Sequence, residues 1–361
     1  MMNSVDDSQP DPGLPEPVLR VRNLDVTFAA RRGDLSVVRG VDLDVGAGEV
    51  VALLGESGSG KSVTARAIMG LLDDNATASA DELWLAGQEL STLDGRSRRA
   101  LRGPVISLVM QDALSALNPV LSIGDQLGEL FRVRSGLRRS AARARAVELL
   151  GLVGIPAPQR RINDYPHQFS GGMRQRILIA MAIASDPKLL IADEPTTALD
   201  VTVQAQILDL LNRLREQLGM SILLITHDLG VVMEVADRLV VMYAGRVVES
   251  GDADRVLDRP AHPYTVALLR SMPQAAGRGA PLLTIPGSPP NPALTPPGCS
   301  FHPRCPLALP ICREQRPLPL APRPGRISAC HRSEELINGE LAGEFAGAAA
   351  AGSIRGEVAD D

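Results

Sequence analysis

The chain has 361 residues, of which 45% are hydrophobic and 22% are charged, an ordinary globular balance with room for two domains. Its formal net charge of −5 argues against a protein that binds nucleic acid through bulk positive charge. The apolar runs are far shorter than the roughly 18 to 20 residues of a membrane-spanning helix, and the acidic, Pro-rich start lacks the features of a signal peptide. We therefore expect a soluble intracellular protein.

Strands and helices are expected to alternate along most of the chain. Residues 1–17 are expected to be a disordered leader. Apolar residues alternate with polar ones over 18–28, which predicts a strand, and the patterns then predict strands at 40–45 and 49–54, a helix at 61–72, a mostly helical insertion over about 113–170, and strands at 189–192 and 222–225. This alternation indicates an α/β fold with a parallel or mixed sheet.

The strand at 49–54 leads into a glycine-rich loop, GESGSGKS, that fits the pattern G-x-x-x-x-G-K-[ST] at every position. Glycines allow backbone N–H groups to turn toward phosphate oxygens, and the N-terminus of the following helix adds partial positive charge. Lys61, one of only two lysines in the chain, would reach the β- and γ-phosphates, and the Ser62 hydroxyl would bind Mg²⁺. The expected phosphate-binding residues are Gly55, Ser57, Gly58, Ser59, Gly60, Lys61 and Ser62.

The strand at 189–192 runs directly into two carboxylates, Asp193 and Glu194. We assign Asp193 to the Mg²⁺ shell and Glu194 to the polarisation of the attacking water. A strand that ends in Asp-Glu is weak evidence alone, but with the phosphate loop about 130 residues upstream it becomes strong. Together the two motifs predict a nucleoside-triphosphate hydrolase.

Four further segments, in order along the chain, resemble motifs of ABC-type ATPases. Residues 169–176 (FSGGMRQR) resemble the signature sequence, and Gln111 follows an apolar run as the Q-loop glutamine does. Residues 198–200 (ALD) resemble the D-loop, and residues 226–228 (THD) the switch-histidine segment. The resemblance implies a P-loop NTPase fold with a mixed sheet and an inserted helical subdomain, over an ATPase domain of residues 18–260.

In this family two ATPase domains pack head to tail, and each ATP lies between the phosphate loop of one domain and the signature of the other. The resemblance therefore implies that the signature residues face the ATP of a partner subunit, and that His227 contacts the γ-phosphate of the chain's own ATP. Gln111 would sense Mg²⁺ and the attacking water. The implied catalytic residues are Glu194, His227 and Gln111, and the implied metal ligands are Ser62, Gln111 and Asp193. The signature residues are Ser170, Gly171, Gly172 and Met173, and the D-loop residue is Asp200. Phe28 would either stack on adenine or belong to the core.

Longer stretches resemble the ATPases of dipeptide and oligopeptide importers: residues 110–119, residues 193–207, and the run from His262 (HPYTVALLRSMP) with IPGSPP after it. Phe169 and Met173 replace the commoner Leu and Gln of the signature, a variant that resembles the D-type ATPase of such permeases; because Met lacks the amide of Gln, the signature contacts there are in question. The implied partners are two permease subunits, a second ATPase (an F-type homologue or a second copy) and an extracytoplasmic solute-binding protein, with the chain at the cytoplasmic face of the membrane and no nucleic acid bound.

Other solutes and other roles stay open at this point. Sister systems for nickel, glutathione or antimicrobial peptides share the same features. A soluble ABC ATPase of DNA repair or translation is a remote alternative, since this chain has one set of motifs and no heptad run. The intact Glu194 and His227 argue against a non-hydrolytic regulatory subunit.

The C-terminal region, residues 261–335, holds all four cysteines, and half of the 28 prolines lie within residues 281–324. Such a segment buries little apolar area alone, so something else must order it. The spacing C-x5-C-x6-C-x17-C has no C-x2-C pair, so the usual zinc ribbon is not indicated; four thiolates on loops suit a [4Fe–4S] cluster, which is associated with this region in D-type ATPases, with zinc or no metal as alternatives. His302 and His331 could replace a ligand or be surface residues, and residues 336–361 are expected to be disordered. The candidate ligands are Cys299, Cys305, Cys312 and Cys330.

Overall fold

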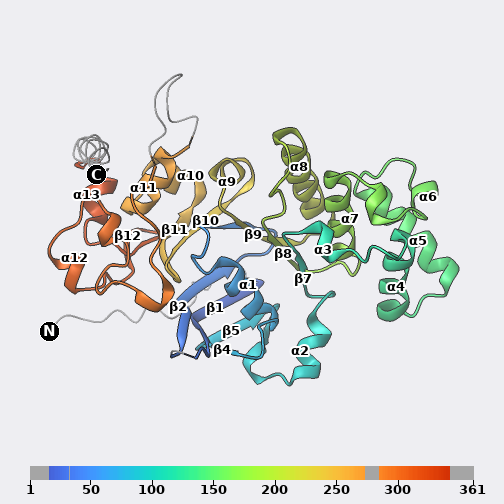
Figure 1. Cartoon of the computed structure of the whole chain (residues 1–361), viewed down its shortest axis with the longest axis horizontal. Coiled ribbons are helices and arrows are strands. Elements are labelled where there is room, and N and C mark those ends of the chain that lie inside the picture. Colours follow the sequence, from blue (N-terminus) through green and yellow to red (C-terminus); the bar gives the residue numbers. More distant parts are fainter. Residues whose placement is uncertain (1–15, 32, 273–283, 342–361) are drawn as a thin grey trace, which may run out of the picture.

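The computed structural model describes residues 16–31, 33–272 and 284–341, and an eight-stranded sheet runs through its centre (Figure 1). Neighbouring strands from β10 to β7 are parallel, whereas β11, β13 and β12 continue the sheet in antiparallel pairs. The sheet is therefore mixed, as predicted. Its strand order is β12 (Leu320–Arg323), β13 (Arg326–Ser328), β11 (Arg246–Asp252), β10 (Arg238–Tyr243), β3 (Val50–Leu54), β9 (Ser221–Thr226), β8 (Leu189–Asp193) and β7 (Ile106–Val109).

A second, antiparallel sheet of five strands forms from the N-terminal part of the chain. Its strands are β1 (Leu19–Phe28), β2 (Leu35–Val45), β4 (Ala76–Ser79), β5 (Glu82–Leu85) and β6 (Gln88–Glu89). The sequence places the start of β2 five residues too late. Gly40 lies inside the strand at φ 59°, and a glycine with positive φ there marks a local irregularity in pairing with β1 rather than the strand's beginning.

The helices cover the central sheet and form a separate group at one end of the molecule. Helix α1 stops three residues before the predicted end, because Gly70 adopts a left-handed conformation (φ 63°) and caps it. The predicted helical subdomain is confirmed: α4 to α6 lie at the end of the molecule opposite the C-terminal region (Figure 1). In the described part of the chain no helix is both long and apolar enough to cross a membrane.

The helices have the following bounds: α1 (Lys61–Met69), α2 (Gly95–Leu101), α3 (Ala113–Ala116), α4 (Ile123–Ser135), α5 (Arg139–Leu152), α6 (Pro158–Arg161), α7 (Gly171–Ile183), α8 (Val201–Leu218), α9 (Leu229–Val235), α10 (Ala253–Asp258), α11 (Pro263–Arg270), α12 (Ile311–Glu314) and α13 (Ser333–Ile337).

Burial on both faces explains why the central strands are continuous apolar runs. In β8, Leu190 and Ala192 join the hydrophobic cluster that contains α7 and α8, while Leu189 and Ile191 join the cluster that contains α1 and the N-terminal sheet. Successive side chains of a strand point to opposite faces, so a strand covered on both faces needs apolar residues at every position. The central sheet is therefore packed between two hydrophobic clusters, which hold the carboxyl ends of its strands in place.

The C-terminal region is joined to the ATPase domain by strand pairing and by aromatic packing. Strand β13 pairs with β11, and the ring of Phe301 lies 5.2 Å from that of Tyr243 and 5.4 Å from that of Tyr264, centroid to centroid. Contacts with the ATPase domain therefore contribute to ordering this Pro-rich segment.

The predicted limits of the two chain ends need one correction. The expected start of the disordered tail at residue 336 is too early, because α13 extends to Ile337 and Leu341 is 2% exposed against the hydrophobic cluster of the C-terminal region. Residues 342–361 of that tail, and residues 1–15 of the expected leader, lie outside the described part of the chain.

Candidate active site

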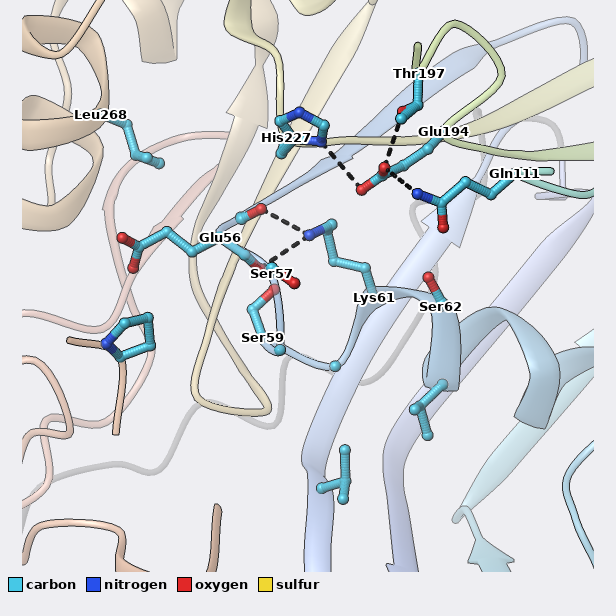
Figure 2. Close-up of a pocket in the computed structure, with 16 residues that line it drawn as sticks. Glu56, Ser57, Ser59, Lys61, Ser62, Gln111, Glu194, Thr197, His227 and Leu268 are labelled. Atoms are coloured by element: carbon cyan, nitrogen blue, oxygen red, sulfur yellow. Dashed lines mark hydrogen bonds and ion pairs between the residues drawn. The ribbon is translucent and has the colours of Figure 1, made fainter. Parts of the chain in front are cut away.

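The carboxyl edge of the central sheet brings the predicted catalytic residues together around one cavity of about 780 Å³ (Figure 2). The phosphate loop follows β3, Gln111 follows β7, Glu194 follows β8 and His227 follows β9. Parallel strands end at the same edge of a sheet, so segments far apart in the sequence meet here. The cavity is also open enough for a nucleoside triphosphate.

The phosphate loop has the backbone shape that its glycines predict. Gly58 and Gly60 have φ values of 79° and 106°, and a Cβ at Gly55 would lie 2.3 Å from the carbonyl oxygen of Met242. Lys61 is 5% exposed; its ammonium donates to the carbonyls of Gly55 (2.7 Å) and Glu56 (3.0 Å), and burial lowers its pKa. The ammonium is thus held at the loop, where phosphate oxygens could replace these two carbonyls.

Two oxygen ligands suited to Mg²⁺ lie side by side at the start of α1. The Ser62 hydroxyl donates to the Asp193 carboxylate over 2.9 Å. Burial raises the pKa of Asp193, although the hydrogen bond from Ser62 opposes that rise. A hydroxyl and a carboxylate oxygen are the hard donors that Mg²⁺ takes together with substrate phosphates and waters. The residues present therefore fit the ion, and Gln111 lines the cavity on the same side as Ser62 (Figure 2).

Glu194 is held by three side chains. Its carboxylate accepts hydrogen bonds from Gln111 Nε2 (2.8 Å) and Thr197 Oγ1 (2.9 Å), and its second oxygen lies 3.1 Å from His227 Nδ1. Burial raises the pKa of Glu194, but the bonds from His227 and Thr197 outweigh it and the net pKa is lowered. Its backbone is left-handed (φ 48°), a strain typical of functional positions. A carboxylate oriented in this way is ionised at neutral pH and can accept a proton from water.

The signature residues lie away from this cavity. Ser170 is the exposed N-cap of α7, and its hydroxyl accepts from the backbone N–H of Met173. A Cβ at Gly172 would lie 2.5 Å from a methyl group of Val203, so α7 and α8 need glycine at this contact. The sulfur of Met173 in α7 lies 3.4 Å from the guanidinium of Arg161 in α6. Asp200 is the N-cap of α8. The chain's own nucleotide cavity is therefore built without these residues.

Phe28 also lies outside the residues that line the cavity. It ends β1 and packs, partly buried, against the cluster below the N-terminal sheet, so its role in adenine stacking stays a prediction. Sequence reasoning missed six cavity-lining residues, which are Val37, Glu56, Val63, Thr197, Leu268 and Pro289. Thr197 had a usable signal, since it lies three residues after Glu194 in a tight turn; Leu268 and Pro289 had none, because they arrive from the C-terminal region.

All four cysteines line one cavity of about 20 Å³ in the C-terminal region, together with His302 and His331. Gly298 allows the close approach: its φ is 67°, and a Cβ there would lie 2.4 Å from the carbonyl of Cys312. Burial raises the pKa of Cys305 and Cys330 to about 12. Across the described residues, however, no three His, Cys, Asp or Glu side chains have the arrangement of a metal-ion site. The donor set fits a metal centre, whereas the space, about that of one water, does not.

Comparisons with known proteins agree with this geometry. The family model for ABC transporters matches residues 38–197, and the model for the oligopeptide/dipeptide transporter C-terminal region matches residues 248–312. Among solved structures, a dimeric ATP-binding cassette in a post-hydrolysis state with ADP and phosphate is 29% identical (TM-score 0.58), with 65% of this chain and 98% of that chain covered. The cbiO1 protein of Clostridium perfringens, part of the cbiONQ transporter complex, is 27% identical (TM-score 0.58), with 68% and 92% covered.

Curated relatives match over nearly the whole chain. The oligopeptide transport ATP-binding protein OppD of Salmonella typhimurium is 47% identical over 321 residues, which cover 89% of this chain and 95% of the relative. The dipeptide transport ATP-binding protein DppD of Bacillus subtilis is 49% identical over 298 residues, 82% and 89% of the two chains. This chain, with its complete phosphate loop, Asp193 and Glu194, therefore belongs to the ATP-hydrolysing subunits of ABC transporters, in the oligopeptide and dipeptide branch.

Proposed function

We propose that this protein energises the import of dipeptides or oligopeptides across the cytoplasmic membrane. The observation that carries the proposal is that the C-terminal region matches the oligopeptide/dipeptide transporter family. This region contacts the ATPase domain through strand β13 and the ring of Phe301. The names of the relatives OppD and DppD support peptides over nickel, glutathione or another small solute.

The second part of the proposal is a pair of ATPase subunits beneath two permease subunits. Ser170 and Gly171 are exposed at the N-terminus of α7 and lie away from the chain's own phosphate loop, which supports their use on the ATP of a partner. The partner is a second ATPase of the F type or another copy of this chain. Contacts with the permease would hold the chain at the cytoplasmic membrane face, where a solute-binding protein delivers the peptide from the other side.

In the proposed cycle, ATP closes the pair and hydrolysis reopens it. Lys61 and the loop amides would hold the β- and γ-phosphates, while Ser62 and Asp193 hold Mg²⁺, with Gln111 near the ion. Glu194 would take a proton from the attacking water as that water adds to the γ-phosphorus and the bond to the β-phosphate oxygen breaks. His227 would contact the departing phosphate.

The four cysteines are proposed to bind a [4Fe–4S] cluster with a structural role. Support comes from four thiols on one small cavity in a loop-rich region. A single zinc ion is the alternative, and it is less suited because the cysteine spacing lacks the C-x2-C pair of the usual zinc ribbon. A cluster requires more room than this cavity of about 20 Å³ offers, so its binding would require the loops that carry the cysteines to move.

Gentle copurification of the tagged chain from native membranes, with mass spectrometry, tests the assembly. Two permease subunits and a second ATPase are expected, and recovery of ribosomal or DNA-repair proteins alone would overturn the transport claim. Anaerobic purification with iron, sulfide and zinc analysis tests the metal. About four iron and four sulfide per chain are expected, with loss of both in Cys312→Ser; stoichiometric zinc, or no metal, would refute the cluster.

A further inference from the structure

An arginine of the C-terminal region holds a residue of the phosphate loop. The guanidinium of Arg304 donates to both carboxylate oxygens of Glu56, over 2.6 and 3.0 Å. Glu56 is the second residue of the loop, 248 positions away along the chain. Arg304 is 7% exposed, and its remaining contacts fix it further: Nε donates to the carbonyl of Pro286, and Nη1 lies 3.4 Å from the hydroxyl of Tyr243. The ion pair therefore joins a buried guanidinium to a partly buried carboxylate, and it is bidentate, the geometry in which an arginine most strongly orients a carboxylate.

Glu56 is contacted from two sides. On the cavity side, its carbonyl accepts from Lys61. On the other side, its backbone N–H donates to the hydroxyl of Tyr264 over 2.8 Å, and its carboxylate meets Arg304. Figure 2 shows the Glu56 carboxylate directed away from the Lys61 ammonium. Two residues of the C-terminal region thus set the backbone and the side chain of a loop residue that Lys61 also contacts.

The charge of Glu56 makes this contact important for nucleotide binding. A carboxylate in a phosphate loop repels the triphosphate, and the repulsion is weakly screened where the groups are partly buried. Glu56 is three-quarters buried at its side chain, and Arg304 is the one basic side chain paired with it among the described residues. Removal of Arg304 would leave a carboxylate without a counter-charge beside the phosphates.

We propose that Arg304 is a positioning residue of the ATP site, which holds the Glu56 carboxylate away from the phosphates and neutralises its charge. The C-terminal region is then part of the nucleotide site and not only a marker of the transporter branch. Since Arg304 directly precedes Cys305, the fold of the cysteine loop sets the position of the guanidinium. The proposal depends on ATP binding alone and is independent of the transported solute and of any metal.

Binding of a non-hydrolysable ATP analogue with Mg²⁺ to the purified full chain tests it by calorimetry. Arg304→Ala is expected to weaken the affinity about tenfold, the effect of roughly one poorly screened charge. Arg304→Lys, which keeps the charge without the fork, should lose less. Arg316→Ala, an exposed arginine of the same region that has no contact with the loop, is the matched control and should bind as the wild type does.

The decisive comparison is between Arg304→Ala and the double variant Glu56→Gln/Arg304→Ala. If Arg304 neutralises Glu56, the double variant recovers most of the lost affinity, because the repelling charge is gone. Wild-type affinity in Arg304→Ala, or a double variant as weak as Arg304→Ala, would overturn the proposal. Circular dichroism melts identify variants that do not fold. If Arg304→Ala does not, the longer and uncharged Arg304→Gln and the double variant Glu56→Gln/Arg304→Gln serve as the pair, with the same two outcomes deciding.

Discussion

Replacing Glu194 with Gln tests the chemistry of the site with the least change in shape. Gln has the size of Glu, so its amide oxygen can still accept the hydrogen bonds that Gln111 and Thr197 now donate over 2.8 and 2.9 Å. Its amide nitrogen can donate to His227 Nδ1, now 3.1 Å from the carboxylate. The variant therefore loses the negative charge and the proton acceptor but keeps the geometry of the cavity. ATP binding should be retained.

The expected loss in turnover follows from the role of a general base. A positioned base contributes about 10²- to 10⁴-fold, which corresponds to roughly 3 to 5 kcal/mol of activation free energy. Phosphate release under saturating Mg-ATP should fall by that factor in Glu194→Gln, while the affinity for a non-hydrolysable analogue stays within about threefold of wild type. The bound state should also accumulate closed ATPase pairs, seen by size-exclusion chromatography with ATP. Turnover within a few-fold of wild type would refute the role of Glu194.

Three other variants probe the surroundings of the site. Thr197→Ala removes one hydrogen bond to the catalytic carboxylate, so turnover should fall about five- to tenfold with little change in analogue affinity, and an unchanged rate would contradict that support. Gly172→Ala places a methyl group 2.5 Å from a side chain of α8 and should lower the melting temperature by a few degrees. The control is Gly171→Ala, whose new methyl group would have an ordinary 3.6 Å contact. Equal melting temperatures for the two variants would count against the overpacking at Gly172. Arg326→Ala leaves the fully buried Glu249 without its charge partner and should cost about 3–5 kcal/mol in urea unfolding; a loss below 1 kcal/mol would show that the pair does not stabilise the region.

The sequence was most informative where one local pattern carries one function. The phosphate loop needs glycines at fixed positions and a lysine after a strand, so its residues could be named before the structure was known. The carboxylate pair at the end of β8 is another such pattern, because a continuous apolar strand places the next residues at the carboxyl edge. Boundaries were less accurate: Gly40 is a strand irregularity that looks like a strand start, and Gly70 ends α1 early.

The remaining features depend on contacts between distant segments, which no local pattern encodes. The pairing of β13 with β11 joins residues about 80 apart through three-residue and seven-residue strands. The pair of Arg304 and Glu56 spans 248 positions, and in the sequence each residue is an ordinary charged side chain. Phe28 is a different case, because its position in the sequence allowed either adenine stacking or a place in the core. In the structure it packs, partly buried, against the core.

The central claim is that ATP hydrolysis by this chain drives peptide uptake. Its most direct test is the complex copurified from native membranes, reconstituted in liposomes and supplied with its solute-binding protein and a labelled oligopeptide. With ATP on the side of the ATPase subunits, peptide should accumulate in the liposome lumen or leave it, according to the orientation of the complex, at a rate that tracks phosphate release. The Glu194→Gln complex should show neither process. Equal peptide movement without ATP, or in the Glu194→Gln complex, would contradict the account.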